Sequence, residues 1–315
     1  MLNRRHIRVK VMQSIYAMHQ SNSDNLDKEE KFLLHSIDNI QDLYLIMVSS
    51  LIEIIKKEAH YLEKSSQKHL STPEERNPNK KFVNNLILNM LAANNSLGIA
   101  LVDRKINNWE LHEDYISLLL NAIKESQLYK NYMQNTSNNF EEDKSFAIAI
   151  FTDIIVPNEK LYEYLEDEKL TWVDDVPVVN THIIKQLNLL SANNINDGLK
   201  ITKLYKDTED KEYVLNLFRK TVLNEADFAK EYADKTPNWD TERIAEIDSI
   251  ILKMAICEFL KFPSIPTKVT INEYLEIAKE YSTPKSSNFI NGILDNLEKE
   301  FQTKKKIQKI GRGLL

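Results

Sequence analysis

Hydrophobic residues recur along most of this chain at intervals of three and four positions, which is the period of an amphipathic α-helix. In the first segment Ile7, Val11, Ile15 and Met18 follow this spacing, and a polar break then precedes a long helical region over residues 27–68. Further helices are expected at about 81–94, 97–105, 111–134, 142–156, 158–167, 180–192, 209–222, 225–234, 240–261, 270–281 and 286–302. The pattern predicts an all-α protein.

The composition supports this fold class. Of the 315 residues, 42% are hydrophobic and 28% are charged, as in a water-soluble globular protein. Only 5 residues are glycine, which disfavours glycine-rich phosphate loops and sheets with many tight turns. No segment approaches the ~18 consecutive apolar residues that cross a bilayer, so no membrane association is expected.

The single cysteine, Cys257, lies in an apolar helical segment and cannot form an internal disulfide. We interpret it as a small buried hydrophobic residue rather than a nucleophile. The lack of a disulfide framework fits a reducing, cytoplasmic compartment. The basic N-terminal segment also lacks the continuous apolar stretch of a secretory signal.

The net charge of −6 is unevenly distributed. The residues before Asp24 contain four arginines or lysines and no acidic residue. The residues after Glu300 contain five and no acidic residue: Lys304, Lys305, Lys306, Lys309 and Arg312. The intervening part carries an excess of 15 acidic over basic residues. A polyanion is therefore expected to bind only where the two termini lie.

At the start of the first predicted helix stand five basic residues, Arg4, Arg5, His6, Arg8 and Lys10. A helix N-terminus carries a partial positive charge, so this cluster does not stabilise the helix. Arg5 shares a helical stripe with Val9, Met12 and Tyr16. Cations beside apolar and aromatic side chains are typical of surfaces that bind single-stranded RNA. The alternative is that the cluster is only a solvated helix start.

No enzymatic motif occurs in the sequence. There is no P-loop, no GxGxxG, no HExxH and no CxxC, and the seven histidines are dispersed without the spacing of metal ligands. We therefore expect a non-enzymatic protein with no catalytic residue, no metal site and no cofactor.

The C-terminal part contains clearer local signals. Thr270 followed by Glu273 forms a candidate capping box, with Val269 and Tyr274 as a hydrophobic staple, which predicts that a helix starts here. Gly292 lies inside the last predicted helix, where glycine costs about 1 kcal/mol relative to alanine. We expect it to mark the close approach of another helix or of a ligand.

Two regions of the chain resemble the NusB family of transcription antitermination factors. The first is "RRHIRVKVMQSIYAM", in which Gln13, Ile15 and Tyr16 match the family pattern of an arginine cluster followed by Q-x-[LI]-Y. The second comprises "IDSIILKMAICEFL", "IPTKVTINEYLEIAKEYS" and "NFINGILD", which are similar to the family signature in order and spacing. The resemblance covers the first 20 residues and roughly 206–302.

This resemblance implies a fold of two packed helical bundles and a non-enzymatic RNA-binding function. It implies a partner, the small-subunit ribosomal protein NusE, with which the protein would recognise boxA-type single-stranded RNA in rRNA transcripts. The pair would act in an RNA polymerase antitermination complex and support rRNA transcription.

The resemblance also implies site residues. RNA would contact the N-terminal cluster, the start of the "PTKV" helix and the turn "PKSSNF", through Arg4, Arg5, His6, Arg8, Lys268, Lys285, Ser286, Asn288 and Phe289. Tyr16 and Asp248 fall where the family contacts NusE.

The chain is longer than the usual family member and resembles the long, Bacteroidetes-type version. We expect an arginine-rich helix of the NusB fold at 1–22, an inserted helical region at 23–205, a C-terminal NusB bundle at 206–303 and a basic flexible tail at 304–315. The inserted region is acidic and is not expected to extend the RNA surface; it would bind a protein or be purely structural.

Two other functions are compatible with parts of this pattern. A helical interaction scaffold could keep the fold without binding RNA. An rRNA cytosine methyltransferase with a NusB-like domain would need a glycine-rich loop for its methyl donor and a catalytic cysteine in a strand–turn context. Five glycines and a cysteine in mid-helix disfavour the enzyme.

Overall fold

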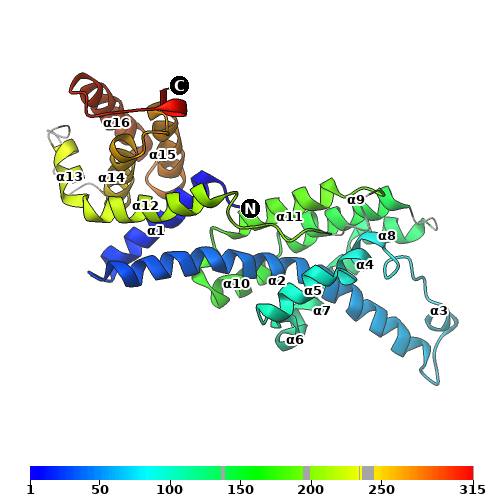
Figure 1. Ribbon diagram of the computed structural model, residues 1–315. Coiled ribbons are helices and arrows are strands. Elements are labelled where there is room, and N and C mark those ends of the chain that lie inside the picture. The colour runs from blue at the N-terminus through cyan, green and yellow to red at the C-terminus, as the bar shows by residue number, and fades with distance from the viewer. Residues whose placement is uncertain (136–138, 194–198, 234, 236–244, 315) are drawn as a thin grey trace. The chain divides into compact units, whose positions relative to one another are not determined.

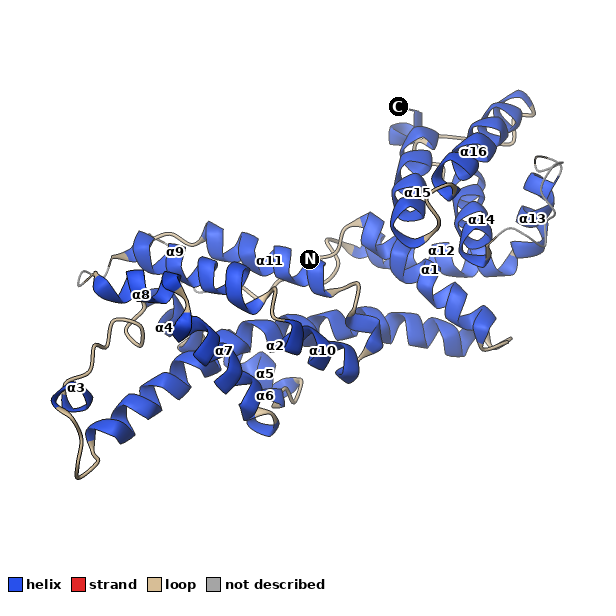
Figure 2. Ribbon diagram, turned by 180° about the vertical axis from the view of Figure 1, so that it is seen from behind, coloured by secondary structure: helices blue, strands red, loops and turns tan. Residues whose placement is uncertain are grey.

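The computed structural model describes residues 1–135, 139–193, 199–233, 235 and 245–314. Within these ranges all regular structure is helical, and no strand occurs (Figure 2). The prediction of an all-α protein is confirmed. The chain divides into two compact units, one formed by Leu2–Ile37 with Tyr205–Leu315 and the other by Asp38–Leu204 with Met1. We call them the terminal unit and the inserted unit.

The terminal unit contains the helices that hold the candidate site, labelled in Figure 1. They are α1 (Arg4–Gln20), α12 (Thr208–Leu223), α13 (Glu225–Ala233), α14 (Glu246–Lys261), α15 (Thr267–Tyr281) and α16 (Ser286–Thr303), followed by a short 3₁₀ turn η5 (Gly311–Leu314). Helix α1 packs against α12, α14 and α15, and α14 packs against α15 and α16. Two segments far apart in the sequence therefore form one bundle.

The apolar stripe of α1 explains this packing. Ile7, Val11 and Ile15 have no exposed surface, because the helical period brings them to the face that meets α12 and α14. Asn3 caps the helix by accepting a hydrogen bond of 2.8 Å from the backbone N–H of His6. Cys257 on α14 is completely buried, and burial raises the pKa of its thiol to about 12, so its prediction as a small core residue is confirmed.

The inserted unit is built around the greater part of α2 (Leu26–Ser66), a helix that also contributes residues to the terminal unit. Its other elements are α3 (Pro73–Arg76), α4 (Leu86–Ala92), α5 (Asn95–Asp103), α6 (Asn108–Leu111), α7 (Glu113–Glu125), α8 (Gln127–Gln134), α9 (Phe140–Ile150), the π-helical turn η1 (Phe151–Ile155), α10 (Glu159–Glu168), the 3₁₀ turn η2 (Leu170–Trp172) and α11 (Val176–Leu189). Two buried tryptophans fasten this unit to α2: the indole of Trp109 donates to the carbonyl of Ile46, and that of Trp172 donates to Asn39.

Most expected helices occur within a few residues of their predicted bounds. The long helix at 27–68 is found as α2, whereas the segment 111–134 is divided by Ser126, which ends α7 and caps α8. The start of the segment 240–261 falls partly outside the described residues. The sequence placed the first domain boundary after residue 22, but in the structure the terminal unit extends to Ile37.

Two local predictions are wrong. Helix α15 begins at Thr267, one turn before the predicted capping box, so Thr270 lies inside the helix and Val269 is exposed. The hydroxyl of Thr270 donates to Glu258 instead of capping a helix. Gly292 was expected to mark the close approach of another helix or of a ligand, and the approach of a helix is wrong, because a Cβ placed there would meet nothing within 4 Å.

The C-terminal segment was expected to be a flexible tail, but two of its lysines bind groups of neighbouring helices. Lys306 pairs with Glu231, and Lys309 donates to the backbone carbonyls of Glu258 and Phe262 at the end of α14. Burial lowers the pKa of Lys309 to about 8. The last carbonyls of a helix have few or no backbone partners, and here a lysine donates to two carbonyls at such an end.

Among the described residues, no single helix is long and apolar enough to cross a membrane. One pair of short helices, α4 and α5, bent by 46° at their junction, meets the length and composition criteria only when the two are joined.

The open space around Gly292 and Gly98 leads to a stability prediction. Each lies inside a helix, and a Cβ at either position meets nothing within 4 Å. Gly292→Ala and Gly98→Ala should each raise the free energy of unfolding by about 0.5–1 kcal/mol, because alanine loses less backbone entropy in a helix. Urea denaturation measures this change. A destabilised Gly292→Ala variant would mean that this face packs against something in solution.

Candidate nucleic-acid interface

The N-terminal arginines contact acidic side chains on three other helices of the terminal unit. The most deeply placed is Arg8, which is 2% exposed. Its Nε and Nη2 atoms donate to the two carboxylate oxygens of Glu258 on α14, at 2.7 and 3.0 Å. Glu258 is completely buried, so this is an ion pair inside the bundle.

Three hydroxyl groups complete the surroundings of Glu258. Tyr213 of α12, Tyr274 of α15 and Thr270 of α15 all donate to its carboxylate, the last two at 2.9 and 3.0 Å. The guanidinium carbon of Arg8 also lies 5.6 Å from the ring centres of both tyrosines. We call these five residues the buried cluster. It joins α1, α12, α14 and α15 through one carboxylate.

Within the buried cluster, Arg8 and Glu258 are ionised and the two tyrosines are neutral. Burial opposes ionisation of Arg8, but the attraction of Glu258 outweighs it and raises the pKa of the guanidinium. Burial likewise opposes ionisation of Glu258, and the nearby Arg8 lowers the pKa of that carboxyl below its ordinary value. Burial and the Glu258 charge raise the pKa values of both tyrosines, so their hydroxyls remain donors.

Arg8 is therefore not a surface contact for phosphate. The sequence placed it with the RNA-binding residues because it follows Arg4 and Arg5, but α1 turns it toward the bundle interior, and its Nε and Nη2 already donate to Glu258. His6 is 6% exposed and also lies on the inner side of the helix. Of the predicted N-terminal contacts, only Arg4 and Arg5 present their guanidinium groups at the surface.

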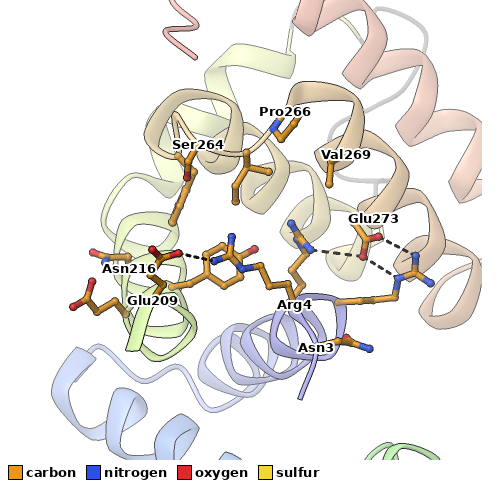
Figure 3. Close-up of a pocket in the computed structure, with 14 residues that line it drawn as sticks. Asn3, Arg4, Glu209, Asn216, Ser264, Pro266, Val269 and Glu273 are labelled. Carbon is orange, nitrogen blue, oxygen red and sulfur yellow. Dashed lines mark hydrogen bonds and ion pairs between the residues drawn. The ribbon is translucent and has the colours of Figure 1, made fainter. Parts of the chain in front are cut away.

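Arg4 and Arg5 line a groove of about 840 Å³ in the terminal unit (Figure 3). Its walls come from α1, α12, the loop after α14 and the start of α15, and they include Tyr213, Asn216, Phe262, Ile265, Pro266 and Val269. Glu209 stands at one end of the groove and Glu273 at the other (Figure 3).

Both surface arginines are paired with acidic residues in or next to the groove. Arg4 donates through Nε to Asp210 at 2.9 Å and lies 3.7 Å from Glu209. Arg5 makes two parallel hydrogen bonds with Glu273 of α15, at 2.9 and 3.0 Å. The hydrogen bond to Glu273 raises the pKa of Arg5 above its ordinary value. The side chains remain 38% and 44% exposed.

The other predicted RNA residues lie near the two ends of α15. Lys268 is exposed in its first turn. At the start of α16, Lys285 and Asn288 are exposed and Phe289 is half-buried. Ser286 is buried, and its hydroxyl donates to Asp248 at 2.7 Å, so it holds the turn and does not face solvent.

The two predicted partner contacts lie close to one another but differ in exposure. Tyr16 is 38% exposed and lines a shallow depression of about 370 Å³ with Ile247, Tyr281, Ser282 and Thr283. Asp248 is only 5% exposed and accepts hydrogen bonds from Ser282 and Ser286. Tyr16 can touch a partner directly, whereas Asp248 shapes the turn beside it.

The last turn of α1 carries a second charged cluster. The two ring nitrogens of His19 lie 3.0 Å from Glu225 and 3.1 Å from Glu246, and Lys253 lies 3.2 Å from Glu225. The hydrogen bond with Glu225 raises the pKa of His19 above its ordinary value. This cluster ties the end of α1 to α13 and α14.

Sequence reasoning missed Glu258, Tyr213 and Glu273 as partners of the arginines. Glu258 carried a usable signal, because it is a single acidic residue within the apolar segment "MAICEFL". An acid in such a position needs a buried cation, and the basic helix start offered one.

Comparison with known proteins agrees with this architecture. The sequence pattern of the NusB family matches residues 178–299. A protein of Salinibacter ruber named transcription antitermination protein NusB is 41% identical over 115 residues, which are 36% of this chain and 70% of the relative. This chain belongs to the NusB family.

Two other relatives carry the same name. The Chloroherpeton thalassium protein is 40% identical over 109 residues, 35% of this chain and 52% of the relative. The Clostridium kluyveri protein is 43% identical over 96 residues, 30% of this chain and 62% of the relative. No solved structure matches this chain.

Family membership confirms the resemblance found in the sequence. The relatives are named as antitermination proteins and not as enzymes, which also agrees with the expected non-enzymatic class. The matched range begins at residue 178, earlier than the expected 206, and does not include α1. The NusB pattern therefore contains the groove walls on α12, the loop after α14 and the start of α15, while the arginines of α1 lie outside it.

The buried cluster predicts stability effects of very different size for two nearby arginines. Arg8→Ala leaves Glu258 buried without its cation and should lower the free energy of unfolding by about 3–5 kcal/mol. Arg5→Ala removes a surface pair and should change it by less than about 1 kcal/mol. Chemical denaturation of both variants measures the difference. Equal small effects would show that Arg8 is not locked in the bundle.

The cluster at the end of α1 predicts a pH dependence. Because the pKa of His19 is higher in the folded protein than in the unfolded chain, the pairing stabilises the fold fully below about pH 6.5 and is lost as the pH rises through the folded pKa. The wild type should exceed His19→Gln in stability by more at about pH 5.5 than at about pH 8.5. Denaturation at both pH values tests this, and an advantage that grows toward alkaline pH would contradict the assignment.

Proposed function

We propose that this chain acts in transcription antitermination by binding boxA-type single-stranded RNA of rRNA transcripts together with NusE, in the cytoplasm. The membership of its terminal unit in the NusB family, whose relatives carry that functional name, is the observation that supports this most strongly. Since the chain spans between about half and 70% of these relatives, the activity and the partners are carried over as proposals.

The RNA surface that we propose follows α15. Arg4 and Arg5 lie on the α1 side of the groove, Lys268 is exposed in the first turn of α15, and Lys285 and Asn288 are exposed near the far end. Guanidinium groups bind phosphates with two parallel hydrogen bonds, and lysines add point charges. Half-buried Phe289 would offer one edge of its ring to a base. Arg8, His6 and Ser286 would support this surface from within.

We place NusE beside Tyr16. The depression that Tyr16 lines is bordered by the turn after α15, which is the same turn that leads to Lys285. RNA and NusE would thus meet at neighbouring parts of the terminal unit, which offers a physical reason for them to bind together. The role of the inserted unit would be structural or in protein binding, because its residues lie mostly outside the family pattern.

A titration of a boxA-containing RNA with the full chain tests this function. It is carried out with and without NusE and beside a scrambled RNA of the same length. We expect tighter, sequence-selective binding when NusE is present. Equal weak binding of both RNAs, unaffected by NusE, would contradict the proposal and favour a helical scaffold that has kept the fold without the RNA.

Arg5→Ala should weaken binding of the boxA RNA and reduce the slope of log affinity against log salt by ~0.7, the value for one lost phosphate contact on single-stranded RNA. Arg219→Ala is the matched control, because Arg219 on α12 also forms a two-point pair with a glutamate, Glu30, and lies outside the groove. Salt-dependent fluorescence anisotropy measures both. An unchanged slope for Arg5→Ala would remove Arg5 from the RNA surface.

A further inference from the structure

The arginine best placed to meet a phosphate is already bound to a carboxylate of its own chain. Arg5 offers Nε and Nη2 to the two oxygens of Glu273, which is the same two-point geometry that a guanidinium uses to hold a phosphate. A phosphate that takes these two donors must therefore displace Glu273. The pair is 44% exposed on the Arg5 side and 22% on the Glu273 side, so a ligand in solvent can reach it.

Glu273 would not be left without a cation after this exchange. One of its oxygens lies 3.6 Å from Nη1 of Arg8, and Arg8 is held in place by Glu258 of the buried cluster. The carboxylate can therefore release Arg5 while staying next to a positive charge. This lowers the electrostatic cost of opening the pair, because the released carboxylate would otherwise have no cation beside it.

Taking RNA binding as proposed above, we infer that Glu273 is an internal competitor for the phosphate site of Arg5, so that the free chain holds this site closed and RNA binds by exchanging a phosphate for the glutamate.

Arg4 is less suited to the same exchange. Two acidic residues face it, Asp210 at 2.9 Å and Glu209 at 3.7 Å, and its guanidinium carbon lies 5.1 Å from the ring centre of Tyr213. Asp210 is buried. Removing Arg4 from these contacts breaks more interactions than removing Arg5 from one glutamate. Of these two arginines, Arg5 is therefore the one whose carboxylate partner a phosphate replaces more readily.

Such competition would favour the correct RNA over weak polyanions. Every ligand that binds Arg5 must first break the Arg5–Glu273 pair, which costs free energy. Only a ligand that also contacts other parts of the surface gains enough free energy to offset this cost. The acidic groove walls act in the same direction, since Glu209 and Glu212 repel a polyanion that enters without engaging the arginines.

The test measures affinity for boxA-containing RNA in a double-mutant cycle of Glu273→Gln and Arg5→Ala, using the full chain with NusE. Glu273→Gln alone should tighten binding by about two- to fivefold at low salt, the factor that corresponds to one exposed ion pair. In the Arg5→Ala background the same change should give a clearly smaller gain, because only the general loss of a negative charge remains. Glu273→Ala provides a second variant without the carboxylate, and melting temperatures confirm that each variant folds.

Glu276→Gln is the matched control for charge. Glu276 lies on the same helix, is 45% exposed and pairs with Lys279 rather than with Arg5. It removes the same negative charge, so a general loss of repulsion would make it as effective as Glu273→Gln. We expect a smaller gain from Glu276→Gln, because Glu276 makes no hydrogen bond with Arg5 and acts on it through a longer-range charge interaction.

The outcomes separate this inference from the proposed function. If Arg5→Ala leaves RNA affinity unchanged, the proposed contact between Arg5 and RNA is wrong. If Arg5→Ala weakens binding but Glu273→Gln gives no gain, or gives the same gain with and without Arg5, the RNA contact stands and the competition by Glu273 is overturned.

Discussion

The ion pair between Arg8 and Glu258 is the interaction on which the terminal unit depends. It joins the first helix of the chain to a helix about 250 residues later, and the hydroxyls of Tyr213, Tyr274 and Thr270 bring two further helices to the same carboxylate. Buried charges are costly unless they are paired and hydrogen-bonded, and here the carboxylate of Glu258 accepts from side chains of three other helices. The register of α1 in the bundle is therefore fixed, and with it the position of Arg4 and Arg5.

Because the position of α1 is fixed, its nearby arginines differ in exposure and in role. One turn of α1 separates Arg5 from Arg8, yet the first is half-exposed at a groove and the second has almost no exposed surface. A cluster of cations at a helix N-terminus is unfavourable for the helix alone, and carboxylates of α12, α14 and α15 compensate for it in the folded chain. The basic start is thus in the first place a structural device, with Arg5 the member that can also serve a ligand.

The sequence predicted the helical class, most helix positions, the buried Cys257 and the family, because periodic apolar residues and the motifs near "PTKVTINEY" are local features. It failed where long-range pairing decided the outcome. Arg8 and Glu258 are far apart in the sequence, so the burial of Arg8 could not be read from its neighbours. Thr270 and Glu273 matched a capping box but contact the buried cluster and Arg5, and tertiary contacts of this kind override local preference. Lys306 and Lys309 looked like a free tail because their partners on α13 and α14 lie far back in the chain.

The central claim is that Arg5 serves the ligand whereas Arg8 serves the fold. Side-chain NMR of the arginine Nε–Hε groups in the full chain, followed while boxA RNA and NusE are added, tests it most directly. We predict that the Arg5 signal shifts as its donors pass from Glu273 to a phosphate, while the Arg8 signal stays in place and exchanges slowly with solvent. A shift of the Arg8 signal with an unchanged Arg5 signal would contradict the account.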